Sequence, residues 1–528
     1  MLVEAADLRK TRVGADVCVI GAGPAGLAVA AELSKGGVDV VVLEAGGRPY
    51  DRLELANLAR TFKDHWGGAQ SLTRGRNRGE PYYPLRLSRT RGLGGSTNAL
   101  RSHGLRVRHL DALDFEARFD AGWPMPFEEL HRFAATAERF VGLGGSAPVD
   151  WTPRTPEIGS QRWSRMSGAP FRHAPRRTVP ERAMMMAAAA SPRLITAAVV
   201  AGLGTVKSNR LSGVEVARRR GGPLTVQAEA FVLAAGGIDN ARLLLAARPV
   251  LYAMEEAAGQ VGRNFMEHPH FIAGYLVPSS DVSLAELGAF FGDPAGEARW
   301  LTAGDGVVRR EDLLRVAVSG VPVHPASLHA AVPAAGELAR LLPFGPYGLH
   351  ERVRQAATAV RGSYRVAGAL AGRIRGEARS VLALPVMIEQ PPDPASRVAL
   401  GSRVDRTGLA LPELHWRVGN REFASARRTI ELMAEEAERS GVGEVISLWD
   451  DGRSRPDVVT GGWHHMGTTR MSVDPSEGVV DADCKVHGLD NLFVAGSSVF
   501  ASSGYANPTL TLVALAARLG EHLAAGRS

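Results

Sequence analysis

Three glycines, Gly21, Gly23 and Gly26, follow an apolar, β-branched run at residues 15–20 in the pattern Gly-x-Gly-x-x-Gly. The first permits a tight turn, the second lets the backbone approach a pyrophosphate, and the third lets a helix pack against the strand. Glu44 ends the next apolar run, where its carboxylate can accept a hydrogen bond from a ribose hydroxyl. The pattern predicts dinucleotide binding without separating FAD from NAD. A glycine-rich turn in an unrelated α/β protein is the alternative.

Two more glycine-rich segments can bring the backbone close to such a cofactor. Residues 91–98 read RGLGGSTN, and residues 231–238 read FVLAAGGI, a hydrophobic strand that ends in small residues. Small side chains allow a flavin or its phosphates to lie against the backbone N–H groups. For the first segment the alternative is an ordinary surface loop.

The most specific motifs lie in the C-terminal part of the chain. Residues 462–471 read GWHHMGTTRM, residues 491–498 read NLFVAGSS, and residues 506–511 read ANPTLT. With the segments above and in this order, the chain resembles the glucose–methanol–choline (GMC) family of flavin oxidoreductases. The resemblance is dense at both ends of the chain and loose over about 276–455.

The resemblance implies FAD and an α/β fold of two domains. A Rossmann-like FAD-binding domain would carry an inserted antiparallel-sheet substrate domain with helices. In some relatives a histidine at the position of Asn98 carries covalently attached flavin, so the resemblance implies non-covalent FAD here. The implied cofactor-binding residues are Gly21, Ala22, Gly23, Ala25, Gly26, Glu44, Ala45, Arg91, Gly94, Gly95, Ser96, Asn98, Ala235, Gly236, Gly496, Ser497, Asn507, Pro508 and Thr509.

The resemblance also implies oxidation of an alcohol, such as a hydroxyl of a sugar, glycoside or polyol. His464 falls on the family's catalytic histidine, and Asn507 on its partner, which is asparagine in pyranose-oxidase-like members and histidine in others. A neutral imidazole, with an ordinary pKa of about 6.5, can accept the hydroxyl proton as general base while hydride leaves for flavin N5. Asn507 would position the substrate oxygen, and the N–H groups from Thr509 onward would face the flavin. Electron acceptors in the family include oxygen, quinones and carrier proteins, so the oxidase and dehydrogenase readings both stay open.

Several alternatives stay open beside this interpretation. His465 can act as the base in place of its neighbour. Asn507 before Pro508 is also the pattern of a helix N-cap followed by proline at the first helical position. The family includes hydroxynitrile lyases, which are non-redox, and a nicotinamide dehydrogenase would share the glycine motif. His268 and His270 resemble a family turn segment rather than a pair of metal ligands.

The elements that must position these residues follow from the hydrophobic periodicity. A strand at 15–20, a helix at 27–35 and a strand at 38–43 form a β–α–β unit. Other expected elements are a hairpin of 214–217 with 224–228, strands at 380–388, 410–418 and 491–496, and helices at 334–342, 350–375, 422–440 and about 508–524. We expect the FAD-binding domain over 1–275, the substrate domain over 276–455, and a return to the FAD-binding domain over 456–528.

Composition excludes several classes of protein. The 528 residues are 45% hydrophobic and 22% charged, which excludes a largely disordered chain. The net charge of +7 comes from basic residues scattered among acids, so no nucleic-acid partner is expected. Cys18 and Cys484 are too few for a disulfide framework or a zinc site. Residues 1–12 lack the apolar stretch of a signal peptide and no run is long enough to span a bilayer, so we expect a cytoplasmic protein without membrane contact.

Overall fold

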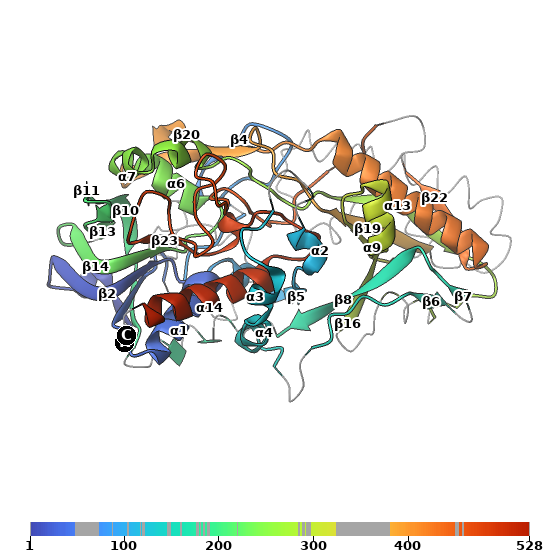
Figure 1. Ribbon diagram of the computed structural model, residues 1–528, viewed down its shortest axis with the longest axis horizontal. Coiled ribbons are helices and arrows are strands. Elements are labelled where there is room, and N and C mark those ends of the chain that lie inside the picture. Colours follow the sequence, from blue (N-terminus) through green and yellow to red (C-terminus); the bar gives the residue numbers. More distant parts are fainter. Residues whose placement is uncertain are drawn as a thin grey trace.

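A computed structural model describes residues 2–47, 73–323 and 381–526, apart from short gaps within the last two ranges. Two large sheets lie toward opposite ends of the molecule (Figure 1). The first has the order β1-β9-β3-β2-β14-β13-β10, with β23 paired to β14. Its strands are β1 (Leu2–Glu4), β2 (Arg12–Ile20), β3 (Val40–Leu43), β9 (Arg193–Thr196), β10 (Val199–Leu203), β13 (Val214–Ala217), β14 (Leu224–Leu233) and β23 (Leu492–Val494).

The centre of the first sheet is parallel and buried on both faces. Strand β2 pairs in parallel with β3 and β14, and β14 pairs in parallel with β23. The residues that end these strands are apolar and buried, as a strand between two helical layers requires. Because parallel strands present their carboxyl ends at one edge, the glycine-rich segments that follow these strands meet there.

Helix α1 (Pro24–Lys35) follows β2 and begins at Gly23, with Pro24 at its first position. Helix α14 (Thr509–Ala525), from the far end of the chain, runs beside it (Figure 1). The two helices approach closely where Gly520 faces Val29, since a side chain at 520 would meet the Val29 carbonyl oxygen at 3.0 Å. The two ends of the chain therefore build one α/β layer.

The second sheet is antiparallel and has the order β22-β15-β19-β17-β16-β8-β5, with β18 paired to β19. Its strands are β5 (Leu105–Val107), β8 (Met166–Ala174), β15 (His270–Pro278), β16 (Glu297–Ala303), β17 (Val316–Val318), β18 (Val321–Val323), β19 (Val381–Ile388) and β22 (Gly443–Ser447). Helix α13 (Asn420–Arg439) lies at this end of the molecule and buries Phe423, Ile430 and Met433 (Figure 1).

Smaller elements connect the two sheets. A three-stranded sheet joins β20 (Arg397–Val404), β21 (Ala410–His415) and β4 (Arg76–Asn77). The remaining elements are the strands β6 (Glu157–Ile158), β7 (Gln161–Arg162), β11 (Val206–Lys207) and β12 (Arg210–Leu211), the helices α2 (Ala112–Phe115), α3 (Phe127–His131), α4 (Ala134–Val141), α6 (Asp239–Ala246), α7 (Arg248–Ala253) and α9 (Asp305–Glu311), and the 3-10 turns η1 (Ala5–Asp7), η4 (Gly95–Ser102), η5 (Glu255–Gln260) and η6 (Ser497–Val499).

The α/β fold and the expected β–α–β unit are confirmed, as are the antiparallel hairpin of β13 with β14 and the helix α13. The helices expected at 334–342 and 350–375 lie outside the described residues. The domain boundaries stay a prediction. The second sheet nevertheless takes β5 and β8 from within residues 1–275, so residues 276–455 supply only part of it.

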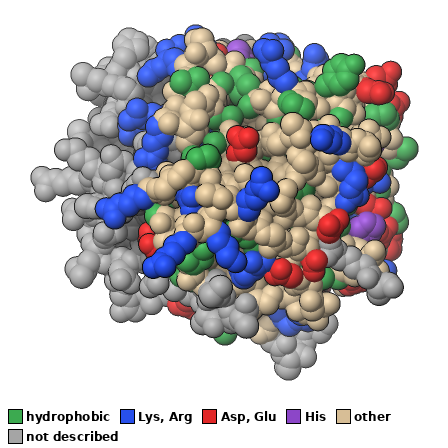
Figure 2. All heavy atoms as spheres, turned by 90° about the vertical axis from the view of Figure 1, so that its left-hand side faces the viewer, with side chains coloured by type: hydrophobic (Ala, Val, Ile, Leu, Met, Phe, Trp, Pro, Cys, Tyr) green, Lys and Arg blue, Asp and Glu red, His purple; other side chains and the backbone are tan. Residues whose placement is uncertain are grey.

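The described surface carries charges of both signs, as the composition indicates (Figure 2). On the face shown in Figure 2, Lys and Arg side chains are dispersed over uncharged surface and lie beside acidic side chains toward the edges. Among the helices described, none combines the length and the apolar character that a bilayer span requires.

Candidate active site

The glycine motif at the carboxyl end of β2 forms a cradle of close backbone contacts. Gly21 has φ +110°, and a Cβ there would lie 2.4 Å from the Ala234 carbonyl oxygen. A Cβ on Gly26 would overlap the Gly21 carbonyl oxygen, so helix α1 can approach the strand only with glycine at 26. Gly23 differs, because the nearest atom to a Cβ added there would be Gly95 Cα, at 4.0 Å. Open space therefore remains beside Gly23, where a pyrophosphate needs it.

Glu44 follows directly after β3 and is buried, with 6% of its surface exposed. Its carboxylate accepts hydrogen bonds from the backbone N–H groups of Ala22 at 2.9 Å and Gly46 at 2.8 Å. These bonds tie the glycine turn to the residues that follow β3, one of which is Ala45. A carboxylate has about four lone-pair positions, so acceptor capacity is left for a ribose hydroxyl.

The segment 91–98 lies against this turn. The Gly94 N–H donates to the Ala22 carbonyl at 2.8 Å. Asn98 is 1% exposed and donates from Nδ2 to the carbonyls of Leu93 and Gly95 at 2.8 and 2.9 Å, while its Oδ1 has no partner among the described atoms. An orphaned buried acceptor beside a glycine loop is a feature that a bound ligand would satisfy. Asn98 therefore holds the loop and keeps one oxygen for a ligand.

Two neighbouring side chains complete the loop's contacts. Ser96 Oγ accepts from the Thr90 N–H at 3.3 Å. Arg91 forms an ion pair with Asp239, with 3.3 Å between Nη2 and Oδ1. The guanidinium that was expected to face the cofactor thus has a carboxylate partner within the protein.

The loop after β14 is anchored by a residue that sequence reasoning missed. Asn240 accepts from the Ala235 N–H at 2.8 Å and donates to Ser498 Oγ at 2.9 Å. Its own N–H donates to the Gly236 carbonyl at 2.9 Å. Asn240 lies in the first turn of α6, and an asparagine three to five residues after Ala-Ala-Gly-Gly was the available signal. It joins the loop after β14 to the loop after β23.

The histidine motif is fixed on both sides by backbone hydrogen bonds. On one side, Met466 exchanges two bonds of 3.0 Å with Met266. On the other, the Thr469 N–H donates to the Ser498 carbonyl at 2.8 Å, and Ser497 Oγ donates to the His465 carbonyl at 2.7 Å. The loop after β23 also reaches the cradle, because a Cβ on Gly496 would lie 3.7 Å from Ala25 Cβ. The tail motif and the N-terminal cradle therefore adjoin.

Three histidines cluster at this point. His464 Nδ1 lies 2.8 Å from His268 Nδ1, and His268 Nε2 lies 2.9 Å from the Gly504 carbonyl oxygen. His270 donates from Nδ1 to the His268 carbonyl at 2.8 Å. Burial, reinforced by the neighbouring imidazoles, lowers the pKa of His464 well below 6.5 and that of His268 to about 3. All three rings are neutral at neutral pH, and the half-buried His464 is accessible from outside the cluster.

A second polar chain lies behind the first. Glu267 is fully buried and accepts the His464 N–H at 2.8 and 3.0 Å, the His268 N–H at 2.8 Å and the Tyr82 hydroxyl at 2.5 Å. Tyr82 also hydrogen-bonds His465 Nε2 at 2.9 Å. Burial raises the Glu267 pKa to about 7 despite these donors. The sequence reading treated this segment as a turn and missed both Glu267 and the role of His268.

Asn507 follows Gly504, whose carbonyl contacts His268, by three residues, and among the described contacts none joins it to His464. Its Nδ2 donates to the Arg106 carbonyl at 2.9 Å, and its buried Oδ1 has no partner within the described structure. The alternative reading of Asn507 as a helix cap is wrong, because Pro508 occupies the N-cap position and no side chain caps α14, which begins at Thr509. The amide is thus left with an unused acceptor.

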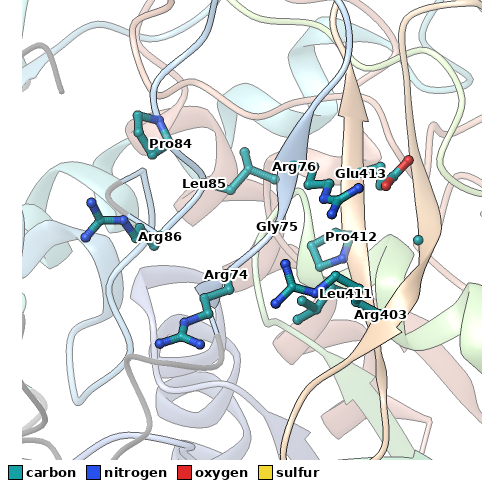
Figure 3. A pocket seen from close by; sticks show the side chains of 11 residues that line it. Arg74, Gly75, Arg76, Pro84, Leu85, Arg86, Arg403, Leu411, Pro412 and Glu413 are labelled. Carbon is teal, nitrogen blue, oxygen red and sulfur yellow. The ribbon is translucent and has the colours of Figure 1, made fainter. Parts of the chain in front are cut away.

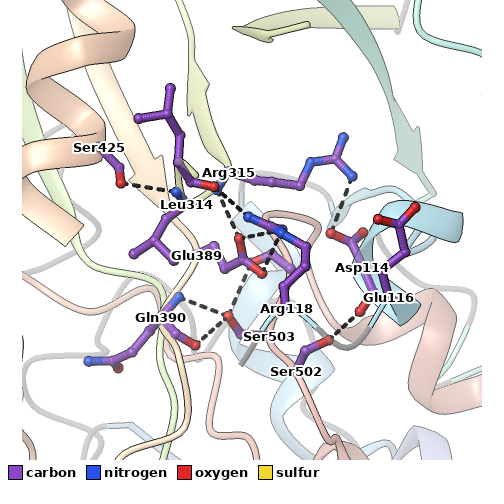
Figure 4. A network of polar contacts seen from close by, with 12 residues as sticks. Asp114, Glu116, Arg118, Leu314, Arg315, Glu389, Gln390, Ser425, Ser502 and Ser503 are labelled. Atoms are coloured by element: carbon purple, nitrogen blue, oxygen red, sulfur yellow. Dashed lines mark hydrogen bonds and ion pairs between the residues drawn. The ribbon is translucent and has the colours of Figure 1, made fainter. Parts of the chain in front are cut away.

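The carbonyls of Ser503 and Gly504, which His268 contacts, are held by a network of buried polar groups (Figure 4). Ser503 Oγ accepts from the Gln390 N–H at 2.9 Å and donates to the Gln390 carbonyl at 3.0 Å. The adjacent Glu389 carboxylate accepts from Arg118 at 3.1 Å and from the Arg315 N–H at 2.8 Å. The second sheet thereby positions the backbone that His268 contacts.

One pocket lies apart from this site. It has a volume of about 190 Å³ and opens beside β4 and β21, with four arginines, Arg74, Arg76, Arg86 and Arg403, around it (Figure 3). None of its lining residues belongs to the cradle or to the histidine cluster. Among the described residues, no group of three His, Cys, Asp or Glu side chains could hold a metal ion.

The cradle meets the needs of FAD on three counts. It leaves open space at Gly23, it presents a buried carboxylate at Glu44, and it contains the orphaned oxygen of Asn98. The N-terminus of α1 adds N–H groups that favour a pyrophosphate. The residues present therefore fit the group that the sequence predicts.

Comparison with known proteins agrees with this geometry. The family model described as GMC oxidoreductase matches residues 392–516, and the one described as pyridine nucleotide-disulphide oxidoreductase matches residues 15–113. The chain is 34% identical over 149 residues to a C-glycoside 3-oxidase of Microbacterium trichothecenolyticum, covering 28% of this chain and 27% of the relative. It is 25% identical over 338 residues to the fructose dehydrogenase large subunit of Gluconobacter japonicus, covering 62% and 53%. The chain thus matches about a quarter and about half of the lengths of these relatives.

A solved structure extends the likeness in fold to nearly the whole chain. Pyridoxine 4-oxidase from Mesorbium loti superposes with a TM-score of 0.53 at 19% identity, covering 96% of this chain and 99% of that one. At this identity the likeness concerns the fold alone.

Proposed function

Because the chain belongs to the GMC oxidoreductase family, we propose that it is an FAD-dependent enzyme that oxidises an alcohol group of a sugar, glycoside or polyol. The observation that carries the proposal is the position of His464. Its segment is hydrogen-bonded to the loop after β23, which in turn packs against the start of α1. This connection supports a neutral imidazole beside the dinucleotide cradle.

The cradle residues would hold FAD without a covalent bond. Glu44 would accept a ribose hydroxyl, the turn around Gly23 would face the pyrophosphate, and Asn98 would contribute its unpartnered oxygen. FAD supplies the acceptor for the hydride that an alcohol carbon gives up on oxidation. Asparagine at position 98 offers no nucleophilic ring nitrogen for attachment, which supports non-covalent binding.

His464 is the proposed general base. Its lowered pKa keeps the imidazole neutral at neutral pH, so that it is ready to take the hydroxyl proton. His465 is the weaker candidate, because its ring is buried and its Nε2 is already bonded to Tyr82. Among the described residues no partner is recorded for His464 Nε2.

Asn507 is the proposed partner that positions the substrate oxygen. One N–H of its amide is used by the Arg106 carbonyl, which fixes the plane of the group. The unpartnered Oδ1 can then accept a hydrogen bond from a bound ligand, and the second N–H can donate one to it. Fixed orientation of this kind raises the rate by keeping the reacting atoms in line. The electron acceptor would be oxygen, a quinone or a carrier protein.

Anaerobic flavin reduction tests this function. The purified protein should show flavin absorption, and candidate sugars and polyols should bleach it in the absence of oxygen. His464→Ala should retain flavin and lose at least ~10²-fold in bleaching rate, whereas His465→Ala should lose less. A colourless protein that takes up no FAD would refute the proposal. Bound flavin that no alcohol reduces, together with release of a carbonyl compound, would instead indicate the lyase reading.

A further inference from the structure

We propose that His268 is a positioning residue that holds His464 in a single tautomer, with the proton on Nδ1 and the lone pair on Nε2. The inference rests on the proposed function for the role of His464 as a base. The assignment of the proton rests on the hydrogen-bond geometry and on the buried, neutral state of His268, and it does not depend on the proposed function.

The argument starts at the far nitrogen of His268. Nε2 lies 2.9 Å from the Gly504 carbonyl oxygen and 3.4 Å from that of Ser503. Both oxygens can only accept, so Nε2 must carry a proton. The ring is fully buried, and burial lowers its pKa to about 3, so it holds a single proton at neutral pH. Nδ1 of His268 is therefore an acceptor.

The contact between the two imidazoles fixes the position of the proton on His464. The two Nδ1 atoms are 2.8 Å apart, which is a hydrogen-bond distance and requires one donor and one acceptor. Since His268 Nδ1 carries only a lone pair, His464 Nδ1 must carry the proton. A neutral His464 then has its lone pair on Nε2, which is the nitrogen left to receive a proton from substrate.

The surroundings keep His268 from turning over. Its backbone N–H donates to Glu267 at 2.8 Å, and its carbonyl accepts from His270 at 2.8 Å. The Ser503–Gly504 carbonyls are held through Ser503 Oγ, which bonds both the N–H and the carbonyl of Gln390 (Figure 4). A flipped ring would place a carbon atom where Nε2 now lies and would break its hydrogen bonds to the two carbonyls.

Two substitutions separate this role from simple packing. Glutamine at 268 can accept from His464 Nδ1–H through its oxygen and donate to the Gly504 carbonyl through its amide. Leucine fills similar space and does neither. In hydrolases with a Ser-His-Asp triad, loss of the correct histidine tautomer lowers the rate by about 10⁴-fold. We expect His268→Leu to lose at least ~10²-fold in anaerobic flavin reduction with its flavin spectrum kept, and His268→Gln to stay within ~10-fold of wild type.

Nitrogen-15 NMR of the histidine-labelled holoprotein reads the tautomer directly, because protonated and unprotonated ring nitrogens have distinct shifts. The His464 signals are assigned as those missing from His464→Ala. His487→Gln serves as a matched control, since His487 also bonds a backbone carbonyl, that of Ser472 at 3.0 Å, but lies outside the cluster.

The expected result is protonated Nδ1 and unprotonated Nε2 at His464 in the wild type and in His268→Gln, and a mixture in His268→Leu. A proton on Nε2 in the wild type, or an unchanged tautomer and rate in His268→Leu, would overturn the inference. The wild-type spectrum decides the matter even if the leucine variant fails to fold. An unaltered rate in His464→Ala would refute the proposed base while leaving the tautomer assignment in place.

Discussion

Replacing Glu267 by glutamine removes an ionisable group from the interior and keeps the shape of the side chain. Glutamine can still accept the His268 and His464 N–H groups through its oxygen. Its amide can donate to Tyr82, whose hydroxyl can turn toward His465. In the part of the chain that is described, no ion pair involves Glu267, so neutral donors, among them the backbone N–H of Gly462, stabilise its charge.

The magnitude follows from the pKa. Burial raises the Glu267 pKa from 4.5 to about 7. At about 1.4 kcal/mol per pKa unit, ionisation is about 3.5 kcal/mol less favourable in the folded than in the unfolded protein. A raised folded-state pKa means that this stability is fully present below pH 4.5 and is lost as the pH rises through 7. Between about pH 5 and about pH 8.5 the wild type should lose about 2.5 kcal/mol through this group.

Urea unfolding of both proteins at the two pH values tests this figure. Tryptophan fluorescence and circular dichroism should give coincident transitions. The free energy of unfolding of Glu267→Gln minus that of wild type should increase by about 2.5 kcal/mol from pH 5 to pH 8.5, because all other titrating groups cancel. Glu435→Gln is the matched control: Arg165 lowers the Glu435 pKa below 4.5, so its contribution changes only below about pH 5 and its difference from wild type should stay constant from pH 5 to pH 8.5. A difference that does not change with pH would show that the Glu267 pKa is not raised in the folded protein and would refute the reasoning.

Two further outcomes concern the cradle and the base. Gly23→Ala should fold normally yet lose most of its bound flavin, because the added Cβ projects into the open space beside Gly95 where the cofactor would lie. The measurement is the flavin-to-protein ratio after gel filtration. Gly14→Ala, equally uncrowded but in β2, should keep its flavin, and equal loss in both variants would contradict the assignment. Because the His464 pKa is well below 6.5, the rate of anaerobic flavin reduction in Glu267→Gln should show no acid limb near pH 6.5, and a rate that falls by half there would place the base elsewhere.

The N-terminal half of the site could be read from sequence because its constraints are local. A buried β-branched strand, a glycine turn and a helix that starts with Pro24 are adjacent in the chain, and Glu44 follows at the end of the next strand. The structure adds that the Glu44 carboxylate also binds the N–H groups of Ala22 and Gly46. These bonds are invisible in a spacing pattern, because they depend on the rotamer of one side chain.

The other half could not be read because its contacts join distant segments. The His268–His464 pair spans 196 residues, and the Tyr82–His465 pair spans 383. Strands β5 and β8 likewise enter the second sheet through pairings that no local periodicity reveals. One signal was available in the sequence Glu-His-Pro-His at 267–270. Its polar residues do not alternate with apolar ones as on an exposed strand, which indicates that they are buried and hydrogen-bonded within the protein.

The arrangement around His464 implies a division of labour between charge and geometry. A carboxylate hydrogen-bonded to Nδ1 would raise the basicity of the ring, whereas the neutral His268 in that place only orients it. The nearby carboxylate, Glu267, bonds the backbone N–H of His464 and not its ring. The base is therefore weak and neutral over a wide pH range, and its effectiveness must come from the aim of Nε2. The buried Glu267 charge lowers stability above pH 7, so Glu267→Gln should be more stable than wild type at high pH while its oxygen still accepts the His464 N–H.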